Sequence, residues 1–258
     1  MVVTSRVAQQ ALDRALDDTD QLLLLYQPIH DAKSGAIYGA EALLRQRRET
    51  GEVRSASMIT KAAEERGGYE LFELDSIVMQ TAYEDAARWP REVHLNVNLS
   101  PKEFEGGKVL DRIKPFAEMK KLNLEITETS YIAHPKETED VLRAIKDLGF
   151  GLWLDDFGTG HSSITHLQHF PLDGLKLPGA FVKPLPHDRR CLAIVRSLLT
   201  LAHDLDIHVV AEEVEKQEQL DFLVEHGCEY VQGFLFSRPM APEAFASLLE
   251  RRASQTAR

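Results

Sequence analysis

The chain has 258 residues, of which 43% are hydrophobic and 28% charged, enough for one large domain or two small ones. Its 30 Lys and Arg residues face 41 Asp and Glu residues, so the net charge is −11 with histidine neutral. This acidic balance disfavours binding to polymeric nucleic acid, because phosphate backbones would be repelled. Two cysteines are too few for a disulfide framework or a thiolate zinc site.

The sequence contains no pattern typical of a membrane or secreted protein. The longest aliphatic run near the N-terminus, Leu22 to Tyr26, is far shorter than the roughly 20 apolar residues that cross a bilayer. No signal-peptide pattern precedes it. We therefore expect a cytoplasmic protein that does not associate with membranes.

Short apolar runs bounded by Gly, Pro or Asp alternate with longer segments of helical period, which is typical of βα-repeat proteins. The runs expected to form strands are 22–29, 37–44, 93–98, 122–127, 151–155, 174–177, 208–211 and 230–232. The segments expected to form helices are 58–66, 71–89, 111–119, 135–148, 189–205, 216–225 and 242–252.

The first two strands are separated only by residues 30–36, in which Asp31 and Gly35 indicate a hairpin turn. A parallel crossover needs about a dozen residues, so the first strand should run antiparallel to the second. Eight strands with intervening helices, in a chain near the roughly 250 residues of the class, predict a (β/α)8 TIM-like barrel. A doubly wound open sheet is the alternative.

No Pro/Gly/Ser-rich linker divides the chain, so we expect one barrel domain over residues 21–252 with a C-terminal tail at 253–258. Residues 1–20 are expected to form a leading helix or linker, with Ala8, Leu12 and Leu16 on one face. The simplest interpretation of this segment is a cap on the barrel floor or a frayed end.

Polar side chains lie within or at the end of seven of the predicted strands. They are Glu41, Asn98, Glu125, Asp155, Asp156, Lys176, Glu212 and Gln232. Any one of them could be a helix N-cap or a solvated loop residue. Because the C-terminal strand ends of a barrel share one mouth, their recurrence instead indicates a common site.

Five carboxylates at one mouth would repel each other and take up protons unless divalent cations neutralised them. The oxygen-only ligand set suits Mg²⁺ or Mn²⁺ better than zinc. Two such ions about 3.5 to 4 Å apart can activate a water and stabilise the leaving oxygen of a phosphodiester. Lys176 could bind the phosphate or position the water.

These residues belong to a longer series of ordered motifs. The series is Tyr26-Gln27-Pro28-Ile29, Glu41-Ala42-Leu43 with Arg45, Asn98-Leu99-Ser100, Glu125-Ile126-Thr127-Glu128, Asp155-Asp156-Phe157-Gly158-Thr159-Gly160, Lys176 and Gln232-Gly233-Phe234. In this respect the chain resembles the EAL-domain cyclic di-GMP phosphodiesterases from about Tyr26 to Pro239.

The resemblance implies a barrel with an antiparallel first strand that hydrolyses cyclic di-GMP to linear pGpG with Mg²⁺ or Mn²⁺, two ions being expected and Ca²⁺ inhibiting. The implied metal ligands are Glu41, Asn98, Glu125, Asp155, Asp156 and Glu212. The implied catalytic residues are Glu41, Lys176, Glu212 and Glu128, and the implied substrate contacts are Arg45, Gln232 and Gln27.

Glu128 resembles the residue that anchors the loop after strand five, here Asp156 to Ser163. In the family that loop connects metal binding to a dimer contact, so the resemblance implies a homodimer. A regulatory domain in a longer parent protein could attach at the leading helix. The chain departs from the family at Pro178, where an Asp is usual, and at Glu213, where a Gly is usual.

The main alternative is a catalytically weak or inactive EAL module that acts as a cyclic di-GMP receptor, although such modules typically lack several of the ligands present here. Asp156-Phe157-Gly158 occurs in protein kinases, but no glycine-rich phosphate loop accompanies it. A barrel glycosidase would use two carboxylates without needing Asn98, Lys176 or a metal.

Overall fold

The computed structural model of the protein describes residues 6–100, 102, 104, 108–127, 135–158 and 164–256. Its central sheet contains β1 (Leu22–Asp31), β2 (Ile37–Arg47), β3 (Val53–Ser55), β4 (His94–Leu99), β5 (Leu122–Thr127), β6 (Gly151–Asp155), β7 (Gly174–Leu177), β8 (His208–Ala211) and β9 (Tyr230–Val231). The helices around it are α1 (Arg6–Asp17), α2 (Ser57–Arg66), α3 (Gly68–Ala86), α4 (Lys108–Ile113), α5 (Pro135–Asp147), α6 (Ile164–His169), α7 (Gly179–Val182), α8 (Arg189–Asp204), α9 (Gln217–Glu225) and α10 (Pro242–Thr256).

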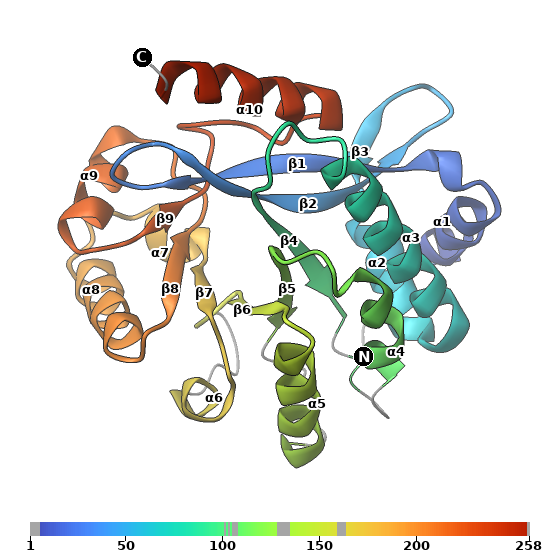
Figure 1. The fold of residues 1–258 in the computed structure, drawn as a ribbon, viewed down its shortest axis with the longest axis horizontal. Coiled ribbons are helices and arrows are strands. Elements are labelled where there is room, and N and C mark those ends of the chain that lie inside the picture. The colour runs from blue at the N-terminus through green and yellow to red at the C-terminus, as the bar shows by residue number, and fades with distance from the viewer. Residues whose placement is uncertain are drawn as a thin grey trace.

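The strands follow the order β1-β9-β8-β7-β6-β5-β4-β2, and pairing of β1 with β2 closes the ring (Figure 1). β1 runs antiparallel to both of its neighbours, whereas every other pair in the ring is parallel. The predicted barrel with an antiparallel first strand is therefore confirmed, and the open-sheet alternative is wrong. The short strand β3 pairs with the outer part of β2.

Side-chain alternation along each strand separates the core from the barrel interior. In β5, Leu122, Leu124 and Ile126 are buried in the main hydrophobic core. Asn123 and Glu125, at the intervening positions, are also buried and point to the opposite face of the strand. The same two-residue period places a polar side chain inside the barrel on several strands and gathers these groups near the mouth.

Helix α1 belongs to a second, smaller core, in which its Ala8, Leu12 and Ala15 are buried against α2 and α3. Leu22 and Leu44 pack beside it. The apolar face of the leading helix is therefore packed against α2 and α3. Helix α10 lies along β1 (Figure 1).

Two other differences from the sequence prediction have local causes. The helix expected over 111–119 is divided into α4 and a 3-10 turn, Lys114–Phe116, which has a proline in its first positions. Proline cannot donate the backbone hydrogen bond that an α-helix would need there. The short helices α6 and α7 and the three-residue strand β3 were not predicted.

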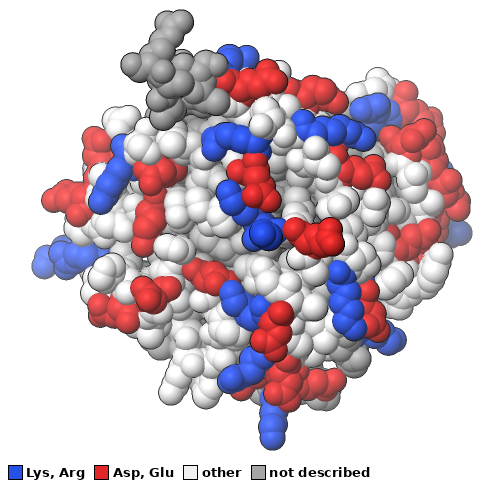
Figure 2. All heavy atoms as spheres, in the orientation of Figure 1, with Lys and Arg blue, Asp and Glu red and all other residues white. Residues whose placement is uncertain are grey.

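Acidic and basic side chains are interspersed over the face shown in Figure 2, in keeping with a net charge of −11. Among the helices that the structure describes, none has the length and apolar composition needed to cross a bilayer.

Candidate metal centre

Lys176, on β7, lies at the centre of the barrel mouth and is only 1% exposed. Its Nζ atom is 3.3 Å from Glu41 Oε2 and 3.0 Å from Glu125 Oε2. It is also 3.3 Å from Asp155 Oδ1 and 2.8 Å from Glu212 Oε1. Four of the five carboxylates proposed from the sequence therefore converge on one ammonium group.

One lysine cannot neutralise four carboxylates. Burial raises the pKa of Glu125 well above its usual value and that of Glu212 to about 7, and Lys176 offsets this only in part. Burial acts in the same direction on Glu41, but Lys176 and hydrogen bonds hold its pKa below the usual value. The carboxylates in turn raise the pKa of Lys176 well above normal despite its burial. A cluster of this charge binds either protons or a cation.

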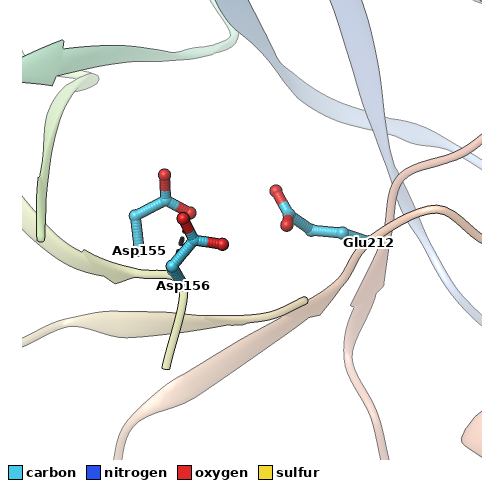
Figure 3. A group of neighbouring side chains, drawn as sticks. All are labelled: Asp155, Asp156 and Glu212. Carbon is cyan, nitrogen blue, oxygen red and sulfur yellow. Dashed lines mark hydrogen bonds between the residues drawn. The ribbon is translucent and has the colours of Figure 1, made fainter. Parts of the chain in front are cut away.

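Asp155, Asp156 and Glu212 form the group best placed to share an ion. One carboxylate oxygen from each lies within 4.8 Å of the others, and Figure 3 shows Glu212 facing the two aspartates across the mouth. The backbone N–H of Asp156 donates to Asp155 Oδ1 over 3.0 Å. Asp156 has a φ of 54°, in the left-handed region that few non-glycine residues adopt.

Amide side chains orient Glu41. Asn98 Nδ2 donates to Glu41 Oε1 over 3.2 Å, and Gln232 Nε2 donates to Glu41 Oε2 over 2.8 Å. Gln232 Nε2 also donates to Gln27 Oε1 over 3.2 Å. Gln232 Oε1 is buried and has no hydrogen-bond partner among the described residues. An acceptor left open at this position fits a site that binds a hydrated cation or a ligand with a donor group.

Two cavities flank the cluster, and Arg45 lines both. The larger, of about 880 Å³, also borders Asn98, Asp156, Glu64 and Asp75. The smaller, of about 340 Å³, is bordered by a different set that includes Gln27, Glu41, Glu212 and Gln232. Arg45 Nη1 donates to the carbonyl oxygen of Leu44 over 2.9 Å. All the predicted substrate contacts therefore border a cavity beside the candidate metal ligands.

One predicted catalytic residue cannot be placed, because Glu128 lies outside the described residues, as do residues 159–163 of the loop after β6. Pro178 is described and stands immediately before α7 with φ −68° and ψ 155°. The backbone of Pro178 is therefore extended, and a proline ring stands two residues after Lys176 in place of a carboxylate.

Two buried asparagines that were not predicted from the sequence support Glu125. Asn96 Nδ2 donates to Glu125 Oε1 over 2.8 Å, and Asn123 Nδ2 donates to Asn96 Oδ1 over 2.9 Å. Gly151 leaves space for these hydrogen-bonded side chains, since a Cβ there would lie 2.1 Å from Asn123 Oδ1. The signal was present in the alternation Asn96, Asn98 on β4 and Asn123, Glu125 on β5.

The donor atoms gathered here are carboxylate and amide oxygens. Hard cations such as Mg²⁺ and Mn²⁺ prefer these ligands, whereas zinc sites use histidine and cysteine more often. The residues present therefore fit a divalent metal centre of the magnesium type.

Comparison with known proteins gives a consistent result. The family model described as "EAL domain" matches residues 9–239. The cyclic di-GMP phosphodiesterase NbdA of Pseudomonas aeruginosa is 34% identical over 93% of this chain and 32% of its own length. The signaling protein YkoW of Bacillus subtilis is 30% identical over 98% of this chain and 32% of its own length. The chain thus spans about a third of these relatives.

Solved structures match the fold as well. The PaMucR phosphodiesterase, in a complex with c-di-GMP, is 30% identical with a TM-score of 0.84, over 92% of this chain and 99% of that one. The EAL enzyme Bd1971 with bound cAMP and cyclic-di-GMP is 26% identical with a TM-score of 0.87, over 96% of this chain and 70% of that one. Because the EAL domain model matches nearly the whole of this chain, the chain belongs to the EAL domain family.

Proposed function

We propose that this chain is a metal-dependent phosphodiesterase that hydrolyses cyclic di-GMP to linear pGpG with Mg²⁺ or Mn²⁺. The observation that carries the proposal is the convergence of carboxylates from β2, β5, β6 and the end of β8 around Lys176. The names of NbdA and PaMucR, both given as phosphodiesterases, support the reaction class for a chain of this family.

The residues that would hold two ions are Glu41, Asn98, Glu125, Asp155, Asp156 and Glu212. Bound ions would supply Lewis acidity to a phosphate oxygen and to an attacking water. Lys176 provides a fixed positive charge among these ligands and would position the water or the phosphate. Gln232, Gln27 and Arg45 border the adjoining cavities and would contact the ligand.

A direct assay tests this proposal. The purified chain is incubated with cyclic di-GMP and Mg²⁺ or Mn²⁺, with and without chelator, and pGpG is followed by chromatography. We expect hydrolysis that the chelator abolishes. Glu41→Gln should lower the rate by more than about a hundredfold, since even outer partners of metal ligands contribute about 10- to 100-fold. Glu52→Gln, which changes a carboxylate that is 62% exposed, is the matched control.

One result would contradict the enzyme proposal, and another would contradict the role of Glu41. Tight binding of intact cyclic di-GMP without pGpG would identify the chain as a receptor, the alternative that Pro178 keeps open. Undiminished turnover of Glu41→Gln would remove Glu41 from the metal site.

We also propose that Ca²⁺ inhibits the reaction, that the protein acts in the cytoplasm and that it forms a homodimer. We further propose that a regulatory domain in a longer parent protein controls the activity of the barrel domain, residues 21–252, since its relatives are about three times as long. Sedimentation velocity at micromolar concentration tests the dimer, and a monomer would contradict it.

A further inference from the structure

Glu213 directly follows the candidate ligand Glu212 and has an unusual backbone conformation. Its φ is 53°, in the left-handed region where the side chain of an L-residue crowds its own backbone. A glutamate persists in this conformation only where its surroundings hold it there. The contacts of the loop after β8 show which neighbours hold Glu213 in this conformation.

The Glu213 side chain reaches across to helix α7. Its Oε2 atom is 2.5 Å from Lys183 Nζ, and both side chains are about half exposed. The side chain also lies against Gly179, where a Cβ would be 2.5 Å from the Glu213 carboxyl carbon. The backbone of Lys183 is held at the end of α7, because its N–H donates to the Gly179 carbonyl oxygen over 2.8 Å. Gly179 therefore supplies the space and Lys183 the opposite charge.

A buried glutamine ties the same two segments together further along the loop. Gln219 Oε1 accepts the backbone N–H groups of Glu215 and Lys216, each over 2.9 Å. Gln219 Nε2 donates to the carbonyl oxygen of Lys183 over 3.4 Å. Glu212 lies just before this anchored stretch, and its Oε1 is 2.8 Å from Lys176 Nζ. The backbone is anchored on both sides of residue 213, because the N–H of Glu212 donates to the Leu177 carbonyl oxygen over 2.9 Å and that of Val214 to the Gln232 carbonyl oxygen over 3.1 Å. Residue 213 is therefore the part of this stretch whose conformation a side-chain pair can still influence.

We propose that Glu213 and Lys183 are a pair of positioning residues that hold the Glu212 carboxylate toward Asp155 and Asp156 and so increase the metal affinity of the site. The identity of the site rests on the proposed function. Because the pair holds the strained backbone before an ion binds, little of the binding free energy is lost in ordering the loop. Neither residue contacts the reacting atoms.

Electrostatics alone predicts the opposite effect for the decisive variant. Lys183→Met removes a positive charge from the neighbourhood of a cation site, which by Coulomb's law should strengthen Mn²⁺ binding. Positioning predicts weaker binding, because residue 213 loses its partner. Likewise, Glu213→Gly removes a negative charge but leaves a residue that adopts φ 53° without strain. Electrostatics predicts weaker binding for that variant, whereas positioning predicts almost no change.

The experiment measures Mn²⁺ binding to the 258-residue chain by calorimetry without nucleotide. We expect Lys183→Met and Glu213→Gln to bind Mn²⁺ about three- to fivefold more weakly than the parent, the upper end of what a half-exposed ion pair contributes. Glu213→Gly should stay within about twofold of the parent. Lys114→Met is the matched control, since Lys114 is also 56% exposed and lies 2.8 Å from a carboxylate of Asp111. The Mn²⁺ affinity of Lys114→Met should equal the parent's, and every variant should unfold cooperatively in chelator with a Tm well above the temperature of the titration.

Each outcome decides the matter. Parent-like or tighter Mn²⁺ binding by Lys183→Met overturns the positioning role, and so does a Glu213→Gly variant that binds more weakly than Glu213→Gln. If the affinities shift as expected but no pGpG forms, the proposed hydrolysis fails and the positioning role stands. If pGpG forms while the affinities stay unchanged, only the positioning role falls. A parent chain that does not bind Mn²⁺ overturns both.

Discussion

Lys176→Met tests how the carboxylate cluster is held together. Methionine has a similar length but removes the charge that lies 2.8 to 3.3 Å from four carboxylate oxygens. Lys176 is 1% exposed, so bulk water screens little of the charge that this substitution removes. Removing one partner of a buried ion pair typically lowers the free energy of unfolding by about 3–5 kcal/mol.

We expect the lower end of that range in the absence of metal. Glu125 and Glu212 already have raised pKa values because they are buried, so each can take up a proton when the lysine charge is lost. Protonation relieves part of the repulsion that remains among the carboxylates. A loss of about 3 kcal/mol would lower Tm by roughly 6–12 °C in a chain of this size.

The assay is urea and thermal unfolding at pH 7 of the parent and Lys176→Met, in chelator and in saturating Mn²⁺. In chelator the variant should be less stable by about 3 kcal/mol. With Mn²⁺ the difference should narrow, because a bound divalent cation supplies charge to the same carboxylates and stabilises the folded state by mass action. A difference in chelator below about 1 kcal/mol, the usual size for an exposed pair, would refute the internal-counterion role. So would a difference that widens with Mn²⁺.

Burial raises the pKa of Asp75 to about 7, although Arg112 lies 3.7 Å away. A carboxyl whose folded pKa is raised contributes stability below its unfolded pKa, near 3.9, and that contribution is lost as pH rises through about 7. Asp75→Asn should therefore flatten the loss of stability between pH 4 and 8 in urea titrations, and an unchanged slope would contradict this. Pro178→Asp should raise turnover in the pGpG assay, and an equal or lower rate would mean that the missing carboxylate is compensated elsewhere. Gly151→Ala should lower the free energy of unfolding by about 1–3 kcal/mol, since its Cβ would lie 2.1 Å from Asn123 Oδ1; parent-like stability would show that Asn123 can move.

Much of the fold could be predicted from the sequence because buried parallel strands give short apolar runs with clear limits. The ranges 122–127, 151–155, 174–177 and 208–211 match β5, β6, β7 and β8. β3 gives no such signal, since only its middle residue is partly buried. The packing of α1 on α2 and α3 depends on partners 40 to 80 residues away, about which a local pattern says nothing.

The site shows the same division. Polar residues at strand ends could be expected to meet, because a closed barrel brings those ends to one mouth. The central place of Lys176 could not be predicted, since it depends on the relative heights of several strands. Asn96 and Asn123 share the two-residue period of Asn98 and Glu125, but the hydrogen bond between them depends on the register of β4 against β5, which no local pattern specifies. The left-handed conformation of Glu213 arises from contacts with Gly179 and Lys183, and local propensity opposes it.

Charge balance finally argues for two ions rather than one. The five candidate carboxylates carry five negative charges when ionised, and the positive charge of Lys176 neutralises one of them, so a net charge of −4 remains. One divalent ion would leave two negative charges at the mouth, which would repel a phosphodiester anion. Two ions bring the cluster to neutrality and allow an anionic ligand to approach. Calorimetry of the parent chain with Mn²⁺ at pH 8 should therefore give a stoichiometry of two, and a single site that persists with a non-hydrolysable phosphodiester present would contradict this charge argument.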